Sequence, residues 1–395
     1  MIQNRLVNRI PWTLIPILMV VSLYAGKADQ TDQLVMGKIV NVFSTTLNEE
    51  RSLWIYLPKD YSKSRDLYPV LYLLDGKENF HHVSGVVEFL SRVSHIAPMI
   101  VVAIINTDRE RDFLSTRVNN MPPIAAAGKF RDFLRNELFA FVEKKYRVLP
   151  YRILCGHSFG AQFCLETFLE VPEMFTVYIA ASTPFDLDDS LLIKKAKLKL
   201  KNLPLTGRFL YFSISGDDGS SIAANREFDR LLKQNLPDGL TWHFDYTEND
   251  DHMTNVHTTV YNGLRWLYRG WRIPESKLHK MSLKDVRAHY RELSNRYGYA
   301  VPIPEGVLLD MGYAYLDQKR FEGAVEIFTF YIKQYPQSAV PHLGIGEVYH
   351  ESARAELARK HYEICYRLAQ ENNDDVILPI IKGILDQING QTGKK

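Results

Sequence analysis

The chain of 395 residues contains few cysteines and almost no excess charge of either sign. Its three cysteines, Cys155, Cys164 and Cys365, are too few and too scattered for a disulfide framework or a zinc site. We therefore expect buried thiols and neither a metal nor a cofactor. The 48 Lys and Arg residues against 46 Asp and Glu residues give a net charge of +2, which argues against a nucleic-acid partner. Hydrophobic residues make up 46% of the chain, which excludes a wholly disordered chain.

An apolar run of about 17 residues, 10–26, follows two arginines and precedes a polar stretch. This order is typical of a signal peptide, and we predict one over residues 1–28 with cleavage after Ala25 or Ala28. The alternative is an uncleaved membrane anchor, because about 17 residues is the lower limit for crossing a bilayer. No cysteine follows the run, which excludes a lipoprotein anchor. We expect a periplasmic or secreted protein.

Short apolar runs alternate with segments of helical period between about 36 and 272, which predicts an α/β fold with a mostly parallel sheet. The continuous runs 69–74 and 99–105 fit interior strands, whereas 51–57 alternates as a half-exposed antiparallel strand does. The clearest helix is predicted over 128–145. The predicted strands are 38–44, 51–57, 69–74, 99–105, 152–155, 176–181, 208–214 and 241–247.

Beyond Trp271 the pattern is helical only, and it contains an internal repeat of 34 residues. This period is typical of tetratricopeptide repeats over roughly 305–371, with a capping helix predicted at 375–388. Such repeats are generic interaction surfaces, so the tail is expected either to bind a protein partner or to pack on the preceding domain. The matched pairs are Gly312 and Gly346, Tyr315 and Tyr349, Ala324 and Ala358, and Phe328 and Tyr362.

The stretch from Gly156 to Gly160 (GHSFG) has the spacing of a nucleophile elbow. It lies between the predicted strand 152–155 and a predicted helix at 161–169, which is the context that such an elbow requires. At the tip of the turn a serine must adopt a strained backbone conformation, and the flanking glycines leave room for it. We predict that Ser158 is a catalytic nucleophile; the alternative is an ordinary serine in a tight turn.

A serine hydroxyl needs a base to take its proton, and in this type of fold the acid and then the histidine follow the serine. His252 is the preferred base, because it follows the strand 241–247 and precedes a predicted helix. His257, inside that helix, is an alternative, and His243, inside the strand, is expected to be structural. His157, next to the serine, is expected to pack against the site or support it.

Two adjacent carboxylates follow the strand 208–214, where the acid that orients the histidine is expected. Asp218 is preferred and Asp217 is the alternative, although Asp-Asp-Gly is also a common turn composition. The remaining alternatives are Glu248, Asp250, Asp251 or no acid at all.

An oxyanion hole needs two N–H donors, one from the residue after the nucleophile and one from the loop after the third strand. Phe159 supplies the first donor. The second is expected after the strand 69–74, where Gly76 permits the turn and the backbone N–H of Lys77 is our candidate.

Four stretches of the chain resemble those of a known family. They are LYLLDG at 71–76, RERDF at 109–113, GHSFGA at 156–161 and the loop that leads to His252. Over about 36–272 the chain resembles the esterase family of α/β-hydrolases, which includes enterochelin esterases, S-formylglutathione hydrolase, feruloyl esterases and mycolyltransferases. The tetratricopeptide tail resembles a subgroup of secreted or periplasmic bacterial members. The resemblance implies Ser158 as nucleophile, His252 as base, and Lys77 and Phe159 as oxyanion donors.

The loop after the strand 99–105 carries Arg109, Arg111 and Arg117, which could hold an anionic substrate such as a catecholate siderophore. The alternative is that Arg111 braces the loop through local ion pairs. The family's siderophore esterases often place tryptophans near the loop after 176–181, and their absence here lowers the case for that substrate. The candidate substrate-binding residues are Gly76, Arg109, Arg111, His157, Pro184 and Phe185.

These observations predict a serine carboxylic-ester hydrolase with an α/β-hydrolase fold, a mostly parallel sheet with helices on both faces, followed by a small all-α tetratricopeptide tail. The alternatives are a siderophore esterase, an acyltransferase, or a non-catalytic scaffold that binds through its tail. We expect a small-molecule ester substrate, and contact with a membrane only if the N-terminal segment is uncleaved. The predicted parts are a signal peptide at 1–28, an esterase domain at 29–275, a helical linker at 276–303 and the repeats with their capping helix at 304–390.

Overall fold

The computed structural model describes residues 34–392 except 60, 63 and 117–125. The predicted signal peptide and Arg117 lie outside the described residues. The described residues within 34–272 together with 296–299 form one compact unit, and those within 273–295 together with 300–392 form the other.

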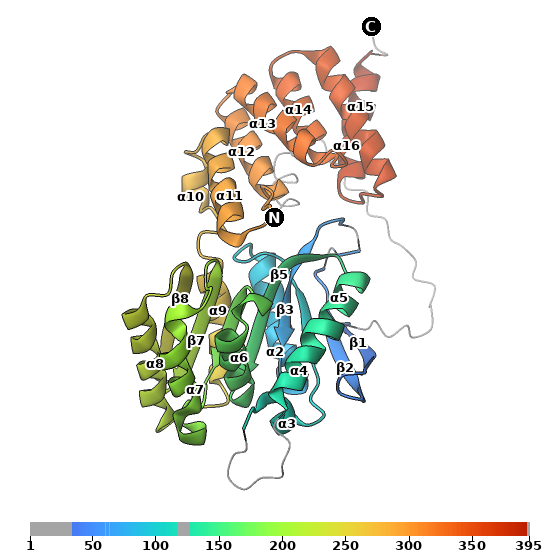
Figure 1. Cartoon of the computed structure of the whole chain (residues 1–395). Coiled ribbons are helices and arrows are strands. Elements are labelled where there is room, and N and C mark those ends of the chain that lie inside the picture. The colour runs from blue at the N-terminus through green and yellow to red at the C-terminus, as the bar shows by residue number, and fades with distance from the viewer. Residues whose placement is uncertain (1–33, 60, 63, 117–125, 393–395) are drawn as a thin grey trace. The chain divides into compact units, whose positions relative to one another are not determined.

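The first unit is built on one sheet of eight strands, and all eight lie where the sequence predicts them (Figure 1). The sheet order is β1-β2-β4-β3-β5-β6-β7-β8, in which β2 runs antiparallel to both neighbours and the other neighbouring strands are parallel. The strands are β1 (Lys38–Ser44), β2 (Glu49–Tyr56), β3 (Tyr68–Leu73), β4 (Ile100–Ile104), β5 (Val148–His157), β6 (Val177–Ala181), β7 (Arg208–Ser215) and β8 (Leu240–Thr247). This arrangement confirms the predicted α/β fold with a mostly parallel sheet.

Helices cover both faces of this sheet, with α2 and α9 in contact on one face and the remaining helices of the unit on the other (Figure 1). The predicted helix at 128–145 is divided by a π-helical turn, Leu134–Leu138, which separates α4 from α5. Two short 3-10 turns lie at Pro172–Met174 and Leu200–Asn202. The helices are α2 (Gly76–Arg92), α3 (Arg109–Phe113), α4 (Ala127–Phe133), α5 (Phe139–Lys145), α6 (Phe159–Glu170), α7 (Leu187–Lys199), α8 (Ser221–Asn235) and α9 (Asn255–Leu267).

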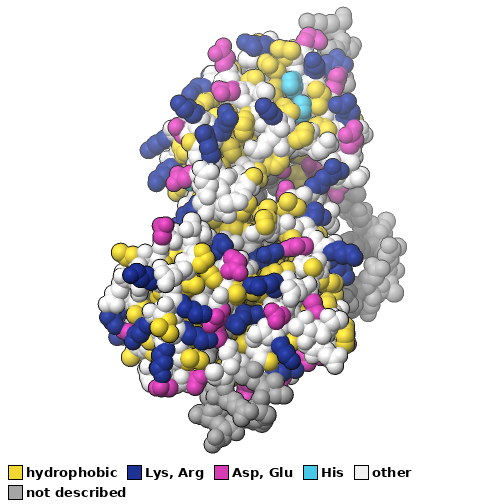
Figure 2. All heavy atoms as spheres, viewed as in Figure 1, with side chains coloured by type: hydrophobic (Ala, Val, Ile, Leu, Met, Phe, Trp, Pro, Cys, Tyr) yellow, Lys and Arg dark blue, Asp and Glu magenta, His cyan; other side chains and the backbone are white. Residues whose placement is uncertain are grey.

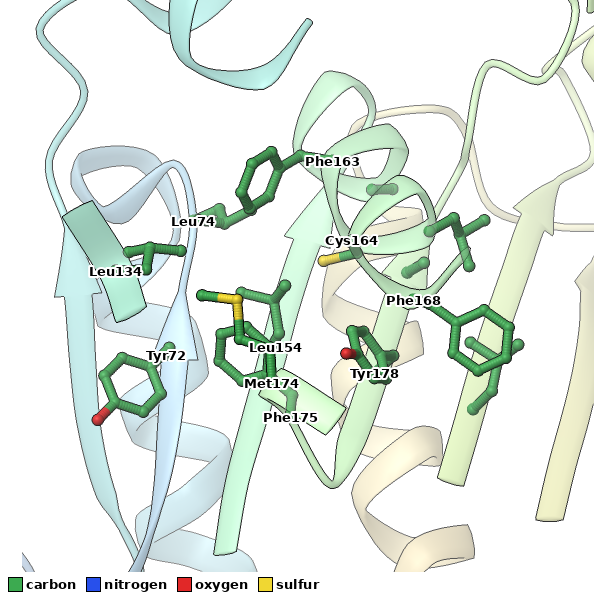
Figure 3. Packing of buried hydrophobic residues seen from close by; sticks show 14 of the residues in the cluster. Tyr72, Leu74, Leu134, Leu154, Phe163, Cys164, Phe168, Met174, Phe175 and Tyr178 are labelled. Atoms are coloured by element: carbon green, nitrogen blue, oxygen red, sulfur yellow. The ribbon is translucent and has the colours of Figure 1, made fainter. Parts of the chain in front are cut away.

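Helix α6 is held against the sheet by fully buried apolar side chains (Figure 3). Phe163, Cys164 and Phe168 of this helix lie in the same core cluster as Leu154 of β5 and Tyr178 of β6. Burial of one such aromatic or aliphatic side chain contributes roughly 1.5–3 kcal/mol. The start of α6 is therefore fixed at the edge of the sheet where the parallel strands end. The expectation of buried cysteines is confirmed, because all three thiols are buried and free.

The second unit consists of helices, and equivalent contacts recur in it at an interval of 34 residues. A Cβ atom on Gly312 would lie 2.5 Å from the ring of Phe328, and a Cβ atom on Gly346 would lie 2.3 Å from the ring of Tyr362. In both helix pairs glycine therefore lets an aromatic ring pack against the helix backbone. The helices are α10 (Glu275–Leu278), α11 (Leu283–Tyr297), α12 (Glu305–Asp317), α13 (Phe321–Gln334), α14 (Val340–Glu351), α15 (Ala355–Glu371) and α16 (Ile377–Thr392).

The short segment 296–299 belongs with the first unit, although the sequence places it in the linker. Its Tyr297 is buried, donates a hydrogen bond of 3.0 Å from its hydroxyl to the carbonyl of Leu267, and packs on Tyr268 with ring centroids 5.2 Å apart. Tyr299 packs on Tyr151 at 5.2 Å. Aromatic side chains beyond the expected boundary therefore complete the core of the first unit.

On the face that Figure 2 shows, Lys and Arg side chains are interspersed with Asp and Glu side chains. This distribution agrees with the net charge of +2. Across the part of the chain that the structure describes, no helix is both long enough and apolar enough to cross a membrane.

Candidate active site

Ser158 lies at the sharp turn between β5 and α6, with φ of 56° and ψ of −119°. Positive φ is costly for a residue with a side chain, so the surrounding contacts must hold this turn in place. A Cβ atom on Gly156 would lie 2.3 Å from the carbonyl oxygen of Gly160, which explains why this position requires glycine. The backbone therefore has the geometry that the sequence predicts for a nucleophile elbow.

The N–H groups of Phe159 and Lys77, the two predicted oxyanion donors, both lie in the first turn of a helix. Phe159 begins α6 and Lys77 is the second residue of α2. N–H groups in a first turn have no partner within their own helix, and the positive end of the helix dipole favours a developing negative charge nearby. A Cβ atom on Gly76 would lie 2.8 Å from the carbonyl oxygen of Ile104, so glycine is needed there for close packing on β4.

The predicted base and acid are in contact. Nδ1 of His252 lies 2.5 Å from Oδ1 of Asp218, whereas Asp217 accepts a hydrogen bond from the Ser215 hydroxyl and does not bond to His252. Of the preferred acid and its neighbour, the structure brings Asp218 to the histidine. Of the other acidic alternatives, Asp250 accepts a hydrogen bond from Thr258, and Asp251 accepts hydrogen bonds from the start of the following turn.

The pKa shifts of His252 and Asp218 favour His252 as a general base. Burial alone would raise the pKa of Asp218, but hydrogen bonds from His252, Ser182 and Ser215 hold that pKa well below its ordinary value. The hydrogen bond to Asp218 is the main cause that raises the pKa of His252, and burial opposes it. An ionised Asp218 therefore accepts the Nδ1–H of His252 and leaves Nε2 as the proton acceptor. The His252 side chain is 39% exposed, so it can be reached from solvent.

The other histidines have different surroundings. His157 is buried, and its Nε2–H donates a hydrogen bond of 2.6 Å to the carbonyl oxygen of His252, with ring centroids 4.7 Å apart. His157 therefore supports the base, and this position replaces the expectation of a substrate contact. His257 lies 3.4 Å from His82, Nδ1 to Nδ1, and His243 stacks on Tyr211.

A buried polar cluster that the sequence analysis missed lies next to Asp218. Asn255, fully buried at the start of α9, accepts hydrogen bonds from the hydroxyls of Ser182 at 3.0 Å and Ser213 at 2.9 Å. Its amide donates to Thr247 at 2.5 Å. Because Ser182 also lies beside Asp218 and helps to lower the pKa of that carboxyl, the cluster joins the acid to the ends of β6, β7 and β8. A signal was present in the sequence, since Ser182 directly follows β6, and Ser213 and Thr247 are polar residues near the ends of β7 and β8.

The two described arginines of the loop after β4 are committed to carboxylates of the protein itself. Arg111 donates from Nε to Asp112 at 2.8 Å and from both terminal nitrogens to Glu49 at 3.0 and 2.7 Å. Arg109 donates to Asp75 at 2.6 and 3.0 Å. The geometry therefore favours bracing of the loop over the binding of an anionic substrate by these side chains.

Phe185 does not line an exposed pocket, contrary to our expectation. Its side chain is 1% exposed and packs on Phe228 of α8, with ring centroids 4.8 Å apart. The apolar ring is drawn into the core cluster because burial there removes its whole surface from water. The neighbouring Pro184 is half-buried.

Within residues 34–392, apart from the gaps given above, no group of three or more His, Cys, Asp or Glu side chains is arranged to hold a metal ion.

A family model described as "Putative esterase" matches residues 44–262, which is more than half of the chain. Ferri-bacillibactin esterase BesA of Bacillus subtilis is 27% identical over 199 residues, which cover 42% of this chain and 68% of BesA. The uncharacterized protein YjcH of the same organism is 28% identical over 206 residues, covering 50% of this chain and 83% of YjcH.

Two solved structures are similar to this one over most of the chain. An IroE-like serine hydrolase from Shewanella oneidensis is 27% identical with a TM-score of 0.63, covering 74% of this chain and 97% of its own. An uncharacterised protein from Capnocytophaga ochracea is 14% identical with a TM-score of 0.61, covering 90% of this chain and 99% of its own. At 14% identity the second likeness concerns the fold alone.

Proposed function

Because this chain belongs to the esterase family whose model it matches, and is an ester hydrolase with an α/β-hydrolase fold, we propose that it acts through a serine nucleophile, Ser158. The observation that carries the proposal is the positive φ of Ser158 at a glycine-bounded elbow. The contact between His252 and Asp218, on loops that follow β8 and β7, supports it. All three residues follow the carboxyl ends of parallel strands, the usual place for active sites in open α/β sheets.

In the proposed reaction Nε2 of His252 takes the hydroxyl proton of Ser158 as its oxygen attacks the ester carbonyl carbon. The carbonyl π bond breaks, and the backbone N–H groups of Lys77 and Phe159 stabilise the resulting oxyanion. Asp218 stabilises the imidazolium through its hydrogen bond to Nδ1. The oxyanion collapses, the ester C–O bond breaks, and the imidazolium gives its proton to the leaving alkoxide. Water then repeats these steps on the acyl-enzyme and releases the acid.

The substrate class we propose is a small carboxylic ester. A ferric siderophore ester is the second candidate, because the similar protein BesA is described as a ferri-bacillibactin esterase. Against an anion-binding role, Arg109 and Arg111 are paired with carboxylates of the chain itself. Transfer of the acyl group to an alcohol uses the same residues and differs only in the acceptor. Assays with p-nitrophenyl acetate, a ferric catecholate ester and added alcohol acceptors distinguish these substrates.

We also propose that the helical unit is a pair of tetratricopeptide repeats and that the enzyme acts in the periplasm or outside the cell. The repeats are supported by the equivalent contacts of Gly312 and Gly346 with aromatic rings 16 residues further along the chain. The location is supported by the signal-peptide pattern over 1–28. A purely non-catalytic scaffold is disfavoured, because a chain that had lost catalysis would not need to keep the strained serine and the His252–Asp218 pair.

The test of this function is Ser158→Ala, assayed with p-nitrophenyl acetate. Loss of the nucleophile is expected to lower kcat by about 10⁶-fold, as removal of a triad serine does elsewhere. Ser91→Ala is the matched control, because the Ser91 hydroxyl only bonds to the carbonyl of Glu88 within α2. Unchanged turnover in Ser158→Ala would refute the proposed nucleophile.

A further inference from the structure

We propose that Arg109 is a positioning residue that sets the spacing between the two oxyanion donors. The inference rests on the proposed function, since it concerns the geometry of the same site. Arg109 begins α3 and follows β4, so it belongs to neither of the two loops that supply the donors. Its guanidinium nevertheless contacts both of these loops.

In the loop that carries Lys77, Arg109 hydrogen-bonds to Asp75, two residues before Lys77. Nε donates to Oδ1 at 2.6 Å and one terminal nitrogen donates to Oδ2 at 3.0 Å. This two-bond fork fixes the orientation of a carboxylate as well as its position. Asp75 is 4% exposed and has φ of 50°, so a buried carboxylate holds a left-handed turn directly before α2.

A further donor completes the coordination of this carboxylate. The side-chain amide of Asn106, which follows β4, donates to Oδ1 of Asp75 at 2.5 Å. A buried carboxylate is costly unless charged and polar partners surround it. Asp75 therefore remains in place only while Arg109 and Asn106 hold it, and the following Gly76 and Lys77 take their positions from it.

On the side of the elbow, the same guanidinium reaches the residues around the nucleophile. Its terminal nitrogen donates to the carbonyl oxygen of His157 at 3.1 Å, and its central carbon lies 5.1 Å from the centroid of the Phe159 ring. In addition, a Cβ atom on Gly160 would lie 3.0 Å from Oδ2 of Asp75, so this carboxylate packs directly against the elbow.

One side chain thus bonds to His157, directly before Ser158, and to Asp75, two residues before Lys77. Each oxyanion donor lies two positions after a residue that Arg109 hydrogen-bonds. Phe159 follows His157 in this way, and Lys77 follows Asp75. A displacement of about 1 Å between a catalytic group and the reacting atoms can cost about 100-fold in rate. Loss of these hydrogen bonds is therefore expected to weaken oxyanion stabilisation without removing any group that touches the substrate.

The competing interpretation is that Arg109 binds an anionic substrate. A neutral and an anionic ester distinguish this interpretation from the positioning role, because only binding depends on the charge of the substrate. Arg109→Met is expected to lower kcat for the neutral ester p-nitrophenyl acetate by about 10- to 100-fold and to change KM by less than about 2-fold. A trifluoromethyl ketone forms an oxyanion with Ser158, so its inhibition constant is expected to rise by a similar factor. Arg109→Lys keeps the positive charge but cannot make the two-bond contact with a carboxylate. Its kcat for p-nitrophenyl acetate is expected to fall by about 3- to 10-fold.

Arg152→Met is the matched control. Arg152 also pairs with a carboxylate, that of Glu143, and also lies over a phenylalanine ring, that of Phe139 at 4.3 Å. It is 27% exposed where Arg109 is 33% exposed, but it lies six residues before Ser158 along β5. Its replacement is expected to leave kcat and the inhibition constant within about 2-fold of the wild type.

Full kcat on the neutral ester in Arg109→Met, with KM raised only for an ester of an anionic acyl group such as mono-p-nitrophenyl succinate, would overturn the proposal. Should Arg109→Met not fold, as judged by circular dichroism, Arg109→Lys and Asp75→Asn decide the question. Both must then lower kcat without raising KM, and full activity in both also overturns it. Failure of the proposed function is separate, because it shows as an active Ser158→Ala protein.

Discussion

At the proposed active site, the loop that carries Ser158 is fixed mainly by its backbone, whereas the loops that carry Asp218 and His252 are fixed by side-chain hydrogen bonds. The elbow depends on Gly156 approaching Gly160 to a distance that no Cβ atom would permit. The acid and the base depend instead on polar side chains such as the hydroxyls of Ser182 and Ser213 and the amide of Asn255. The nucleophile side should therefore be sensitive to added bulk, and the base side to lost polar partners.

On the base side, Asp218→Asn is expected to have the largest effect on turnover in this comparison. The amide can donate to Nδ1 and so stabilise the wrong tautomer, which in a well-studied triad costs about 10⁴-fold in kcat, or about 5.4 kcal/mol. Steady-state kinetics with p-nitrophenyl acetate measure the loss. Asp217→Asn is the control, because Asp217 does not bond to His252. Equal losses in the two variants would contradict the assignment of the acid.

On the nucleophile side, Gly156→Ala is expected to destabilise the protein by about 3 to 4 kcal/mol, because the new Cβ would overlap the Gly160 backbone and force it to move. Urea unfolding measures this change. Gly85→Ala in α2 is the control, since a Cβ there meets nothing within 4 Å. That variant should be neutral or more stable by up to about 1 kcal/mol. A Gly156→Ala protein of wild-type stability would show that the elbow is not held by backbone contact.

The polar cluster offers a smaller test of the base side. Asn255→Leu removes the acceptor of Ser182 and Ser213 and should lower the free energy of unfolding by about 2 kcal/mol, since buried hydroxyls lose their partner. It should also lower kcat by about 10-fold, because Ser182, which helps to lower the pKa of Asp218, then loses the partner that fixes its orientation. Asn262→Leu, later in α9 and half-buried, loses only a 3.3 Å hydrogen bond to Asp245 and should change stability by less than about 1 kcal/mol. A loss of stability with full kcat would separate the cluster from catalysis.

The smallest effect is a shift of the pH profile. A protonated His252 cannot accept the Ser158 proton, so activity is expected to fall as the pH drops through the pKa of His252, which lies above its ordinary value of 6.5. The hydrogen bond to Asp218 is the main cause of this raised pKa. In Asp218→Asn the acidic limb of kcat/KM should therefore move to lower pH while the maximum decreases. An acidic limb that moves to higher pH would contradict the claim that Asp218 raises the pKa of His252.

The sequence predicts those parts of the molecule whose cause is local. Strand positions follow from apolar runs, and the Ser158 elbow follows from glycines two residues away on either side. The 34-residue spacing of Gly312 and Gly346 is likewise visible in the sequence and matches two equivalent aromatic contacts.

The parts that sequence reasoning left open or missed depend on residues far apart in the chain. The choice between Asp217 and Asp218 is made by His252, 34 residues after Asp218. Arg109 meets Asp75 and His157 across separations of 34 and 48 residues. The sequence predicts Phe185 in a pocket because its loop follows a strand, but Phe185 packs in the core against Phe228 of α8. Fold rules place such residues near the site without saying which of them touch.

The central claim is that Ser158 is a nucleophile activated by His252, and labelling with a fluorophosphonate followed by peptide mass spectrometry tests it most directly. We predict one phosphonylated serine, Ser158, in the wild type, no labelling in Ser158→Ala, and labelling slowed by several orders of magnitude in His252→Ala. Labelling that persists in Ser158→Ala, or that is equally fast without His252, would contradict the account.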